Sequence, residues 1–186
     1  DQHIPAALRA VLLGEATFYN VETGEYCYAD ALPFSDDVPV KVSCFTEVDM
    51  DNDAIPEVVL WLERGGNESV MGSIILHYQN GWVYGYPMGY RSMLLETLKA
   101  DGTYSWSGGA FHWGWGRMDF AAGKTRDISW CEGSSGEDEL YYVEQLPAAA
   151  AEFEAASAAQ DAKGDAAWLE LTQENIFECY TGNFLG

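Results

Sequence analysis

The sequence predicts an α+β fold: an antiparallel β-sheet of several hairpins with an N-terminal helix and C-terminal helices. Short runs of β-branched and aromatic residues, separated by Gly, Asn and Asp turn signals, fill residues 16–145. After residue 147 the chain becomes alanine-rich, which favours helix. We see no internal repeat of the kind that a propeller needs. A chain of 186 residues builds one core by default, so we expect residues 1–186 to form a single domain.

The N-terminal part is expected to form a helix and then a hairpin. Residues 5–15 carry apolar side chains at helical spacing, and Pro5 suits a first turn. Residues 16–28 are aromatic and β-branched, with Thr23-Gly24 as the turn.

The central part is expected to be a series of strands. Residues 40–45 and 58–63 flank an acidic loop, and residues 73–78 and 81–86 flank Asn80-Gly81, the strongest hairpin signal in the chain. Residues 93–99 fit a strand or a short helix. Further strands are expected at residues 103–106, 113–120, 125–130 and 139–144.

The C-terminal part, residues 147–182, is expected to be helical. Residues 147–162 predict a helix with Pro147 near its first turn, and Gly164 ends it. Residues 172–180 predict a last helix in which Thr172 is the N-cap.

The acidic loop offers the one ion-site hypothesis, in the stretch FTEVDMDNDAIPEVVLWL. Calcium takes six to eight oxygen ligands, and alternate carboxylates on a tight loop supply several. The expected ligands are four acidic side chains and one backbone carbonyl, at positions 1, 3, 5, 9 and 7 of a calcium loop: Asp49, Asp51, Asp53, Glu57 and the carbonyl of Ile55.

Two departures separate this loop from an EF-hand. Position 6 is Ala54 rather than glycine, and a left-handed backbone there costs alanine roughly 1–2 kcal/mol. Position 12 is Leu60 rather than a bidentate Glu. The loop instead resembles the DxDxDGxxE calcium loops that run directly into a strand, with an expected affinity of order 10⁻⁴–10⁻³ M. The alternative is a metal-free acidic turn, because Asp and Asn are ordinary turn formers.

Charge and composition exclude several classes of partner. The chain has 30 acidic and 9 basic residues, for a net charge of −21, which argues against nucleic acid and against anionic membrane surfaces. No apolar run is long enough to span a membrane. The four cysteines have no zinc spacing, and both a reduced state and an undetermined disulfide pairing stay open: Cys27, Cys44, Cys131 and Cys179.

An aromatic group is the second candidate surface. It consists of Trp82, Tyr84, Tyr86, Tyr90, Trp106, Trp113 and Trp115. Residues 82, 84 and 86 share one face of a strand, which could stack on a glycan or hold a protein ligand. The alternative is an aromatic core, in which case Trp82, Trp106 and Trp115 should be buried.

Most of residues 8–145 resembles uncharacterised secreted or lipoprotein domains of anaerobic Gram-positive bacteria. The likeness lies in the order RAVLLGEATFY, DxDxDxIPEVVL, ILHYQNGWVYGYPMGYR and DGTYSWSGGA. It implies export and surface anchoring through a leader that this chain does not contain. We therefore expect a non-enzymatic, extracellular or cell-surface domain that binds calcium structurally and carries an aromatic recognition surface. The alternative is a secreted hydrolase acting on glycan or peptide.

Overall fold

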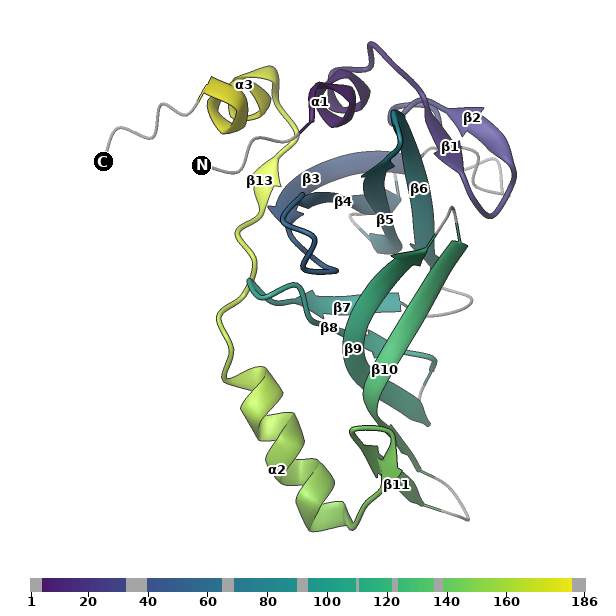
Figure 1. Cartoon of the computed structure of the whole chain (residues 1–186), viewed down its shortest axis with the longest axis vertical. Coiled ribbons are helices and arrows are strands. Elements are labelled where there is room, and N and C mark those ends of the chain that lie inside the picture. The colour runs from purple at the N-terminus through teal and green to yellow at the C-terminus, as the bar shows by residue number, and fades with distance from the viewer. Residues whose placement is uncertain are drawn as a thin grey trace.

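The fold is α+β, as the sequence predicts. A computed structural model describes residues 5–32, 40–64, 69–89, 94–109, 111–121, 124–135 and 139–181. In those ranges, α1 (Ala6–Leu12) precedes the strands, and α2 (Ala150–Asp161) and α3 (Gln173–Thr181) lie near the C-terminus, with one short strand between them. The strands form two sheets rather than one (Figure 1).

The first sheet has seven strands. Their order across the sheet is β13 (Leu169–Glu170), β3 (Val40–Val48), β4 (Glu57–Arg64), β5 (Ser69–Gln79), β6 (Trp82–Gly89), β1 (Phe18–Asn20) and β2 (Glu25–Cys27). Neighbouring strands are antiparallel except β1 and β6, which pair in parallel.

The second sheet has six antiparallel strands. Their order is β12 (Leu146–Pro147), β11 (Leu140–Val143), β10 (Lys124–Ser134), β9 (His112–Ala121), β8 (Tyr104–Ser107) and β7 (Leu94–Leu98).

The first sheet is covered on both faces, which explains the unbroken apolar run of β4. Val58, Leu60 and Leu62 face a core that also contains residues of α1 and α3. Val59 and Trp61 point the other way, toward a core shared with the second sheet. Alternate side chains of a strand lie on opposite faces, so a strand covered on both sides is apolar at successive positions.

Helix α2 is fixed to the second sheet at two places. Phe153 is 4% exposed and its ring lies 5.1 Å from that of Trp115. At the other end of the helix, Lys99 Nζ donates to the carbonyls of Asp161 and Lys163, each at 3.2 Å. A cation is favoured there because the last carbonyls of a helix lack partners and carry partial negative charge.

Several local expectations are confirmed. Asn80 and Gly81 have φ of 53° and 87° and join β5 to β6 as an antiparallel hairpin. Residues 18–27 form the expected hairpin, and residues 94–98 form a strand rather than a helix. Thr172 Oγ1 accepts the backbone N–H of Asn175 at 3.1 Å, as an N-cap should.

The C-terminal part differs from the expectation in two respects. Pro147 lies in β12, opposite Tyr142, and α2 begins at Ala150. Strand β13 interrupts the expected helical region, because residues 169–170 pair with Phe45 and Cys44 at the edge of the first sheet. A two-residue strand carries too little periodicity to be recognised from sequence.

Candidate metal centre in the acidic loop

The acidic loop, residues 49–56, connects β3 to β4, as the sequence predicts for a loop that runs directly into a strand. Figure 1 shows it extending from the first sheet toward β7. Its first residues lie against the turn between β7 and β8. A Cβ atom placed on Gly102 of that turn would collide with the carbonyl oxygen of Asp49, so the glycine permits a close backbone approach.

Three aspartates shape this loop through hydrogen bonds to its own backbone. Asp51 Oδ1 accepts from Asp53 N–H at 3.1 Å, and Asp53 Oδ1 accepts from Ile55 N–H at 2.7 Å. Asp49 Oδ2 accepts from Ala54 N–H at 3.1 Å. The backbone at Ala54 has φ of 68°, so position 6 does require the left-handed conformation that glycine adopts without cost.

The same three aspartates form a group that could hold a metal ion. Asp49, Asp51 and Asp53 each offer a carboxylate oxygen, and these atoms lie within 4.8 Å of one another. Asp49 Oδ1 is buried and has no hydrogen-bond partner in the described part of the chain. Burial raises the pKa of Asp51, and the nearby charge of Asp53 raises it further.

Glu57, the ligand expected at position 9, contacts the start of the loop and a histidine. It is fully buried at the start of β4, and its Oε2 accepts the backbone N–H of Met50 at 2.7 Å. Its Oε1 lies 2.8 Å from His77 Nδ1. Burial raises the pKa of Glu57, while its hydrogen bonds with His77 and Met50 act in the opposite direction.

A second group therefore adjoins the first. Asp51, Glu57 and His77 offer ligand atoms within 4.8 Å of one another, so Asp51 belongs to both groups. The aspartate group presents hard oxygen ligands, which suit calcium or magnesium. The second group adds an imidazole nitrogen, which suits zinc or another transition metal. Ile55 is half-buried beside Asp53, to which its N–H is bonded.

The sequence hypothesis missed His77. It lies in β5, is 2% exposed, and its ring stacks on Phe120 with centroids 4.3 Å apart. Its Nε2 is buried without a partner among the described residues. The sequence signal that could have indicated His77 is its position as a polar residue inside the apolar strand SIILHY, since buried polar side chains need partners.

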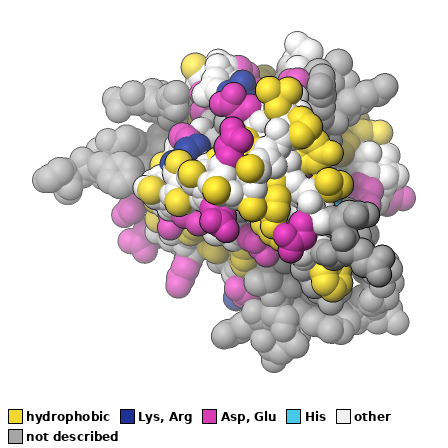
Figure 2. Space-filling model, turned by 90° about the horizontal axis from the view of Figure 1, so that it is seen from below, with side chains coloured by type: hydrophobic (Ala, Val, Ile, Leu, Met, Phe, Trp, Pro, Cys, Tyr) yellow, Lys and Arg dark blue, Asp and Glu magenta, His cyan; other side chains and the backbone are white. Residues whose placement is uncertain are grey.

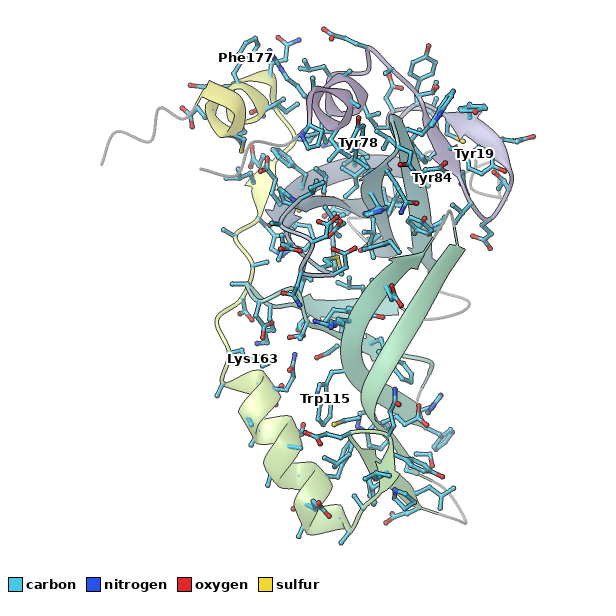
Figure 3. The ribbon with its side chains drawn as sticks, in the orientation of Figure 1. Tyr19, Tyr78, Tyr84, Trp115, Lys163 and Phe177 are labelled. Carbon is cyan, nitrogen blue, oxygen red and sulfur yellow. The ribbon has the colours of Figure 1, made fainter. Side chains whose placement is uncertain are left out.

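The aromatic group divides into core and surface. Trp106 and Trp115 are 2% and 7% exposed, as expected for core, whereas Trp82 is 56% exposed. Trp82 lies near Tyr26, and Tyr26 near Tyr19, with ring centroids 6.2 Å and 5.4 Å apart. Tyr19 and Tyr84 are also neighbours, at 6.1 Å, where β1 pairs with β6 (Figure 3). Tyr90 lies outside the described residues.

The cysteines are unpaired thiols in the structure. Burial raises the pKa of each thiol, which disfavours the nucleophilic thiolate. In the described part of the chain, no hydrogen bond joins a cysteine to a histidine, as a thiol nucleophile with its base would require.

Acidic side chains outnumber basic ones on the face that Figure 2 presents, in line with the net charge of −21. Within the described ranges, no helix is both long enough and apolar enough to cross a membrane. Comparison of the chain with protein families, with curated proteins and with solved structures found no match.

Proposed function

We propose that this chain is a non-enzymatic extracytoplasmic domain whose acidic loop binds calcium as a structural ion. The observation that carries the proposal is the aspartate group, in which three carboxylate oxygens lie within 4.8 Å of one another and Asp49 Oδ1 is buried without a partner. Carboxylates at this separation repel one another, and a buried carboxylate oxygen without a donor is costly. A divalent cation relieves both effects.

The donor chemistry favours calcium at the aspartate group. Asp49, Asp51 and Asp53 provide oxygen only, and the loop lies at the surface, where water can complete the coordination. The role we infer is structural, because the loop lies where the first sheet approaches the β7–β8 turn. A bound ion would fix the loop in the conformation that places Asp49 against Gly102.

The proposed location rests on two arguments. The order of the sequence motifs leads us to expect an exported domain. The strained alanine at position 6 favours an affinity of about 10⁻⁴–10⁻³ M, which is typical of extracellular calcium modules. The exposed aromatic residues Tyr26 and Trp82, with Tyr19 and Tyr84 beside them, form the recognition surface that we propose for a glycan or protein ligand. A soluble glycan that binds this surface should quench tryptophan emission, and the Trp82→Ala variant should lose that quenching.

Calorimetry and thermal unfolding in calcium and in EDTA test the ion. At about 10 mM calcium, an affinity in the expected range stabilises the folded state by about 1.5–3 kcal/mol. Asp51→Ala should abolish most of this stabilisation, since Asp51 belongs to both candidate groups. Glu22→Ala, which removes an exposed acidic residue from the β1–β2 turn, should preserve it.

The same experiment, repeated with zinc, distinguishes calcium at the aspartate group from a transition metal at the second group. If zinc binds more tightly than calcium, and if His77→Gln weakens zinc binding, then the ion binds at the second group. Neither heat nor a melting shift at about 10 mM of any divalent cation would leave the metal-free turn as the correct interpretation.

A further inference from the structure

A cleft of about 350 Å³ lies between strands β3 and β4 of the first sheet and β7, the edge strand of the second sheet, and its lining contains none of the acidic loop's aspartates. It is lined by residues from β3, β4, β7 and the segment that precedes β13: Cys44, Trp61, Glu63, Glu96, Thr97, Leu98, Asp165 and Trp168. This volume is at the lower end for ligand sites in proteins, which suits a small molecule.

One wall of the cleft is the segment of residues 164–168, which is fixed to both sheets. It bonds to the end of β7, where Ala166 N–H donates to the carbonyl of Leu98 at 2.9 Å. It also bonds to β3, where Thr46 Oγ1 donates to the carbonyl of Ala167 at 2.7 Å. Figure 1 shows this stretch of chain between α2 and β13, passing the end of β7. The wall is therefore held in place without a ligand.

Two tryptophans form a corner in the cleft. Trp168 on the wall and Trp61 on β4 lie with ring centroids 5.4 Å apart and ring planes at 72°. Both are partly exposed. A flat sugar ring stacks on one aromatic face, whereas a corner of two rings presents aromatic surface from two sides, which suits a compact ligand.

Two register shifts, typical of β-bulges, lie in strands that line the cleft. In the β3–β4 ladder the register shifts at Ser43, next to Cys44. In the β7–β8 ladder it shifts at Glu96, which itself lines the cleft. Bulges redirect side chains and are frequent beside functional sites.

The charge of the cleft is negative. Its lining contains the carboxylates of Glu63, Glu96 and Asp165, and neither lysine nor arginine. Lys99 Nζ, 2.6 Å from Asp165, is already engaged there and with the carbonyls of Asp161 and Lys163. In the described part of the chain, Glu63 and Glu96 take part in no ion pair.

We propose that this cleft binds a small organic cation, such as a quaternary ammonium or a protonated amine. Indole faces attract cations through their quadrupole, most strongly when the cation is weakly hydrated. The carboxylates supply the opposite charge, and the corner of Trp61 and Trp168 supplies the aromatic contact. Calcium does not fit this lining, because it requires converging oxygen ligands, and these three carboxylates are not among the groups of described residues whose ligand atoms lie within 4.8 Å of one another.

A matched pair of ligands tests the charge. Choline and its neutral isostere 3,3-dimethyl-1-butanol are titrated by calorimetry and tryptophan emission, at fixed calcium. We expect choline to saturate the protein in the millimolar range and the isostere to bind at least about tenfold more weakly. Equal binding of the two, or no binding of choline at about 10 mM, would overturn the proposal.

Variants locate the site. Trp168→Ala should weaken choline binding at least about fivefold, and Glu96→Gln, a change at an exposed position, about threefold. Trp82→Ala removes an exposed tryptophan outside the cleft and should leave the affinity unchanged. Asp51→Ala should also leave it unchanged, which separates this site from the calcium site. Unchanged affinity in both Trp168→Ala and Glu96→Gln would place the ligand elsewhere.

Thiol chemistry provides an independent readout. Cys44 lines the cleft and Cys179 does not, and both are partly exposed. Choline should slow the alkylation of Cys44 while the rate at Cys179 stays constant, measured by peptide mass spectrometry. Equal effects at both thiols would contradict occupation of the cleft.

Discussion

Two connections within the first sheet join neighbouring antiparallel strands, but one is a tight turn of favourable residue types and the other is a longer, strained loop. Between β5 and β6 the chain turns at Asn80-Gly81, two residue types that adopt positive φ readily. Between β3 and β4 it uses residues 49–56, with Ala54 at φ of 68° and three aspartates in close contact. The acidic loop thus carries backbone strain and charge repulsion that a connection alone does not need.

The difference also appears in what holds each connection in place. The Asn80-Gly81 turn depends on its own backbone preference and on the strands that it joins. The acidic loop has hydrogen bonds from its own aspartates and is also held from outside, by Glu57, which accepts the N–H of Met50, and by the turn that contains Gly102. Strain that persists because surrounding structure enforces it is common at functional sites, which agrees with the proposed ion.

The largest effect should come from Glu57→Leu. This change leaves the buried N–H of Met50 and the buried Nδ1 of His77 without their partner. Removing one member of a buried pair costs about 3–5 kcal/mol. Gln79→Ala, a half-buried change beside the tight turn, should cost less than about 1 kcal/mol. Urea unfolding of the two variants measures the difference, and similar losses would show that Glu57 does not anchor the loop.

A pair of glycine substitutions sharpens the comparison. Gly81 and Gly102 have similar φ, 87° and 82°, but a Cβ meets nothing at Gly81 and meets the backbone of Asp49 at Gly102. Gly81→Ala should cost about 1–2 kcal/mol from backbone strain alone. Gly102→Ala should cost at least about 3 kcal/mol, because overpacking adds to that strain. Equal losses in chemical unfolding would mean that the loop does not lie against the β7–β8 turn.

The fold class was predictable from sequence because its signals are local. Asn80-Gly81 specifies its hairpin and Thr172 caps its helix through neighbouring residues. The division into two sheets was not predictable, because the strands of both sheets have the same alternation of apolar and polar residues. Aspartates at alternate positions indicated the candidate ion-binding loop. His77 joins the second candidate group only through strand pairing, and Trp168 reaches Trp61 only through a long connection. Contacts of this kind join residues that are far apart in the chain, so no recognisable spacing in the sequence indicates them.

The pH dependence of stability should distinguish the acidic loop from the rest of the protein. Burial raises the pKa of Asp51 and of Glu57, so each contributes stability at low pH that is lost as pH rises through the folded-state pKa. Burial also raises the pKa of Glu47, in β3, to about 7. Without divalent ions, stability should therefore fall as pH rises from about 4.5 to about 7.

Glu47→Gln separates these contributions. It should remove about 1–2 kcal/mol of that decline, since Glu47 is only partly buried and solvent reduces the effect. The part of the remaining decline that Asp51 contributes should disappear when calcium is added, because the ion stabilises the ionised carboxylates of the aspartate group. The measurement is unfolding in a pH series, with and without calcium. If calcium does not reduce the remaining decline at all, the ionisation of Asp51 does not cause it.

The smallest and most specific effect is expected from Ala54→Gly. Glycine removes a left-handed penalty of roughly 1–2 kcal/mol but loses more chain entropy on folding, so the net gain should be about 0.5–1 kcal/mol. Asn80→Gly is the matched control, because Asn80 also has positive φ but asparagine tolerates it, and its change should be near zero. If the loop binds calcium in the conformation described, Ala54→Gly should also tighten that binding about two- to fivefold, because the apo loop then adopts the binding geometry more readily. A gain in stability without tighter calcium binding would mean that the left-handed backbone serves the connection alone, and the contrast between the two turns would then reflect packing rather than an ion.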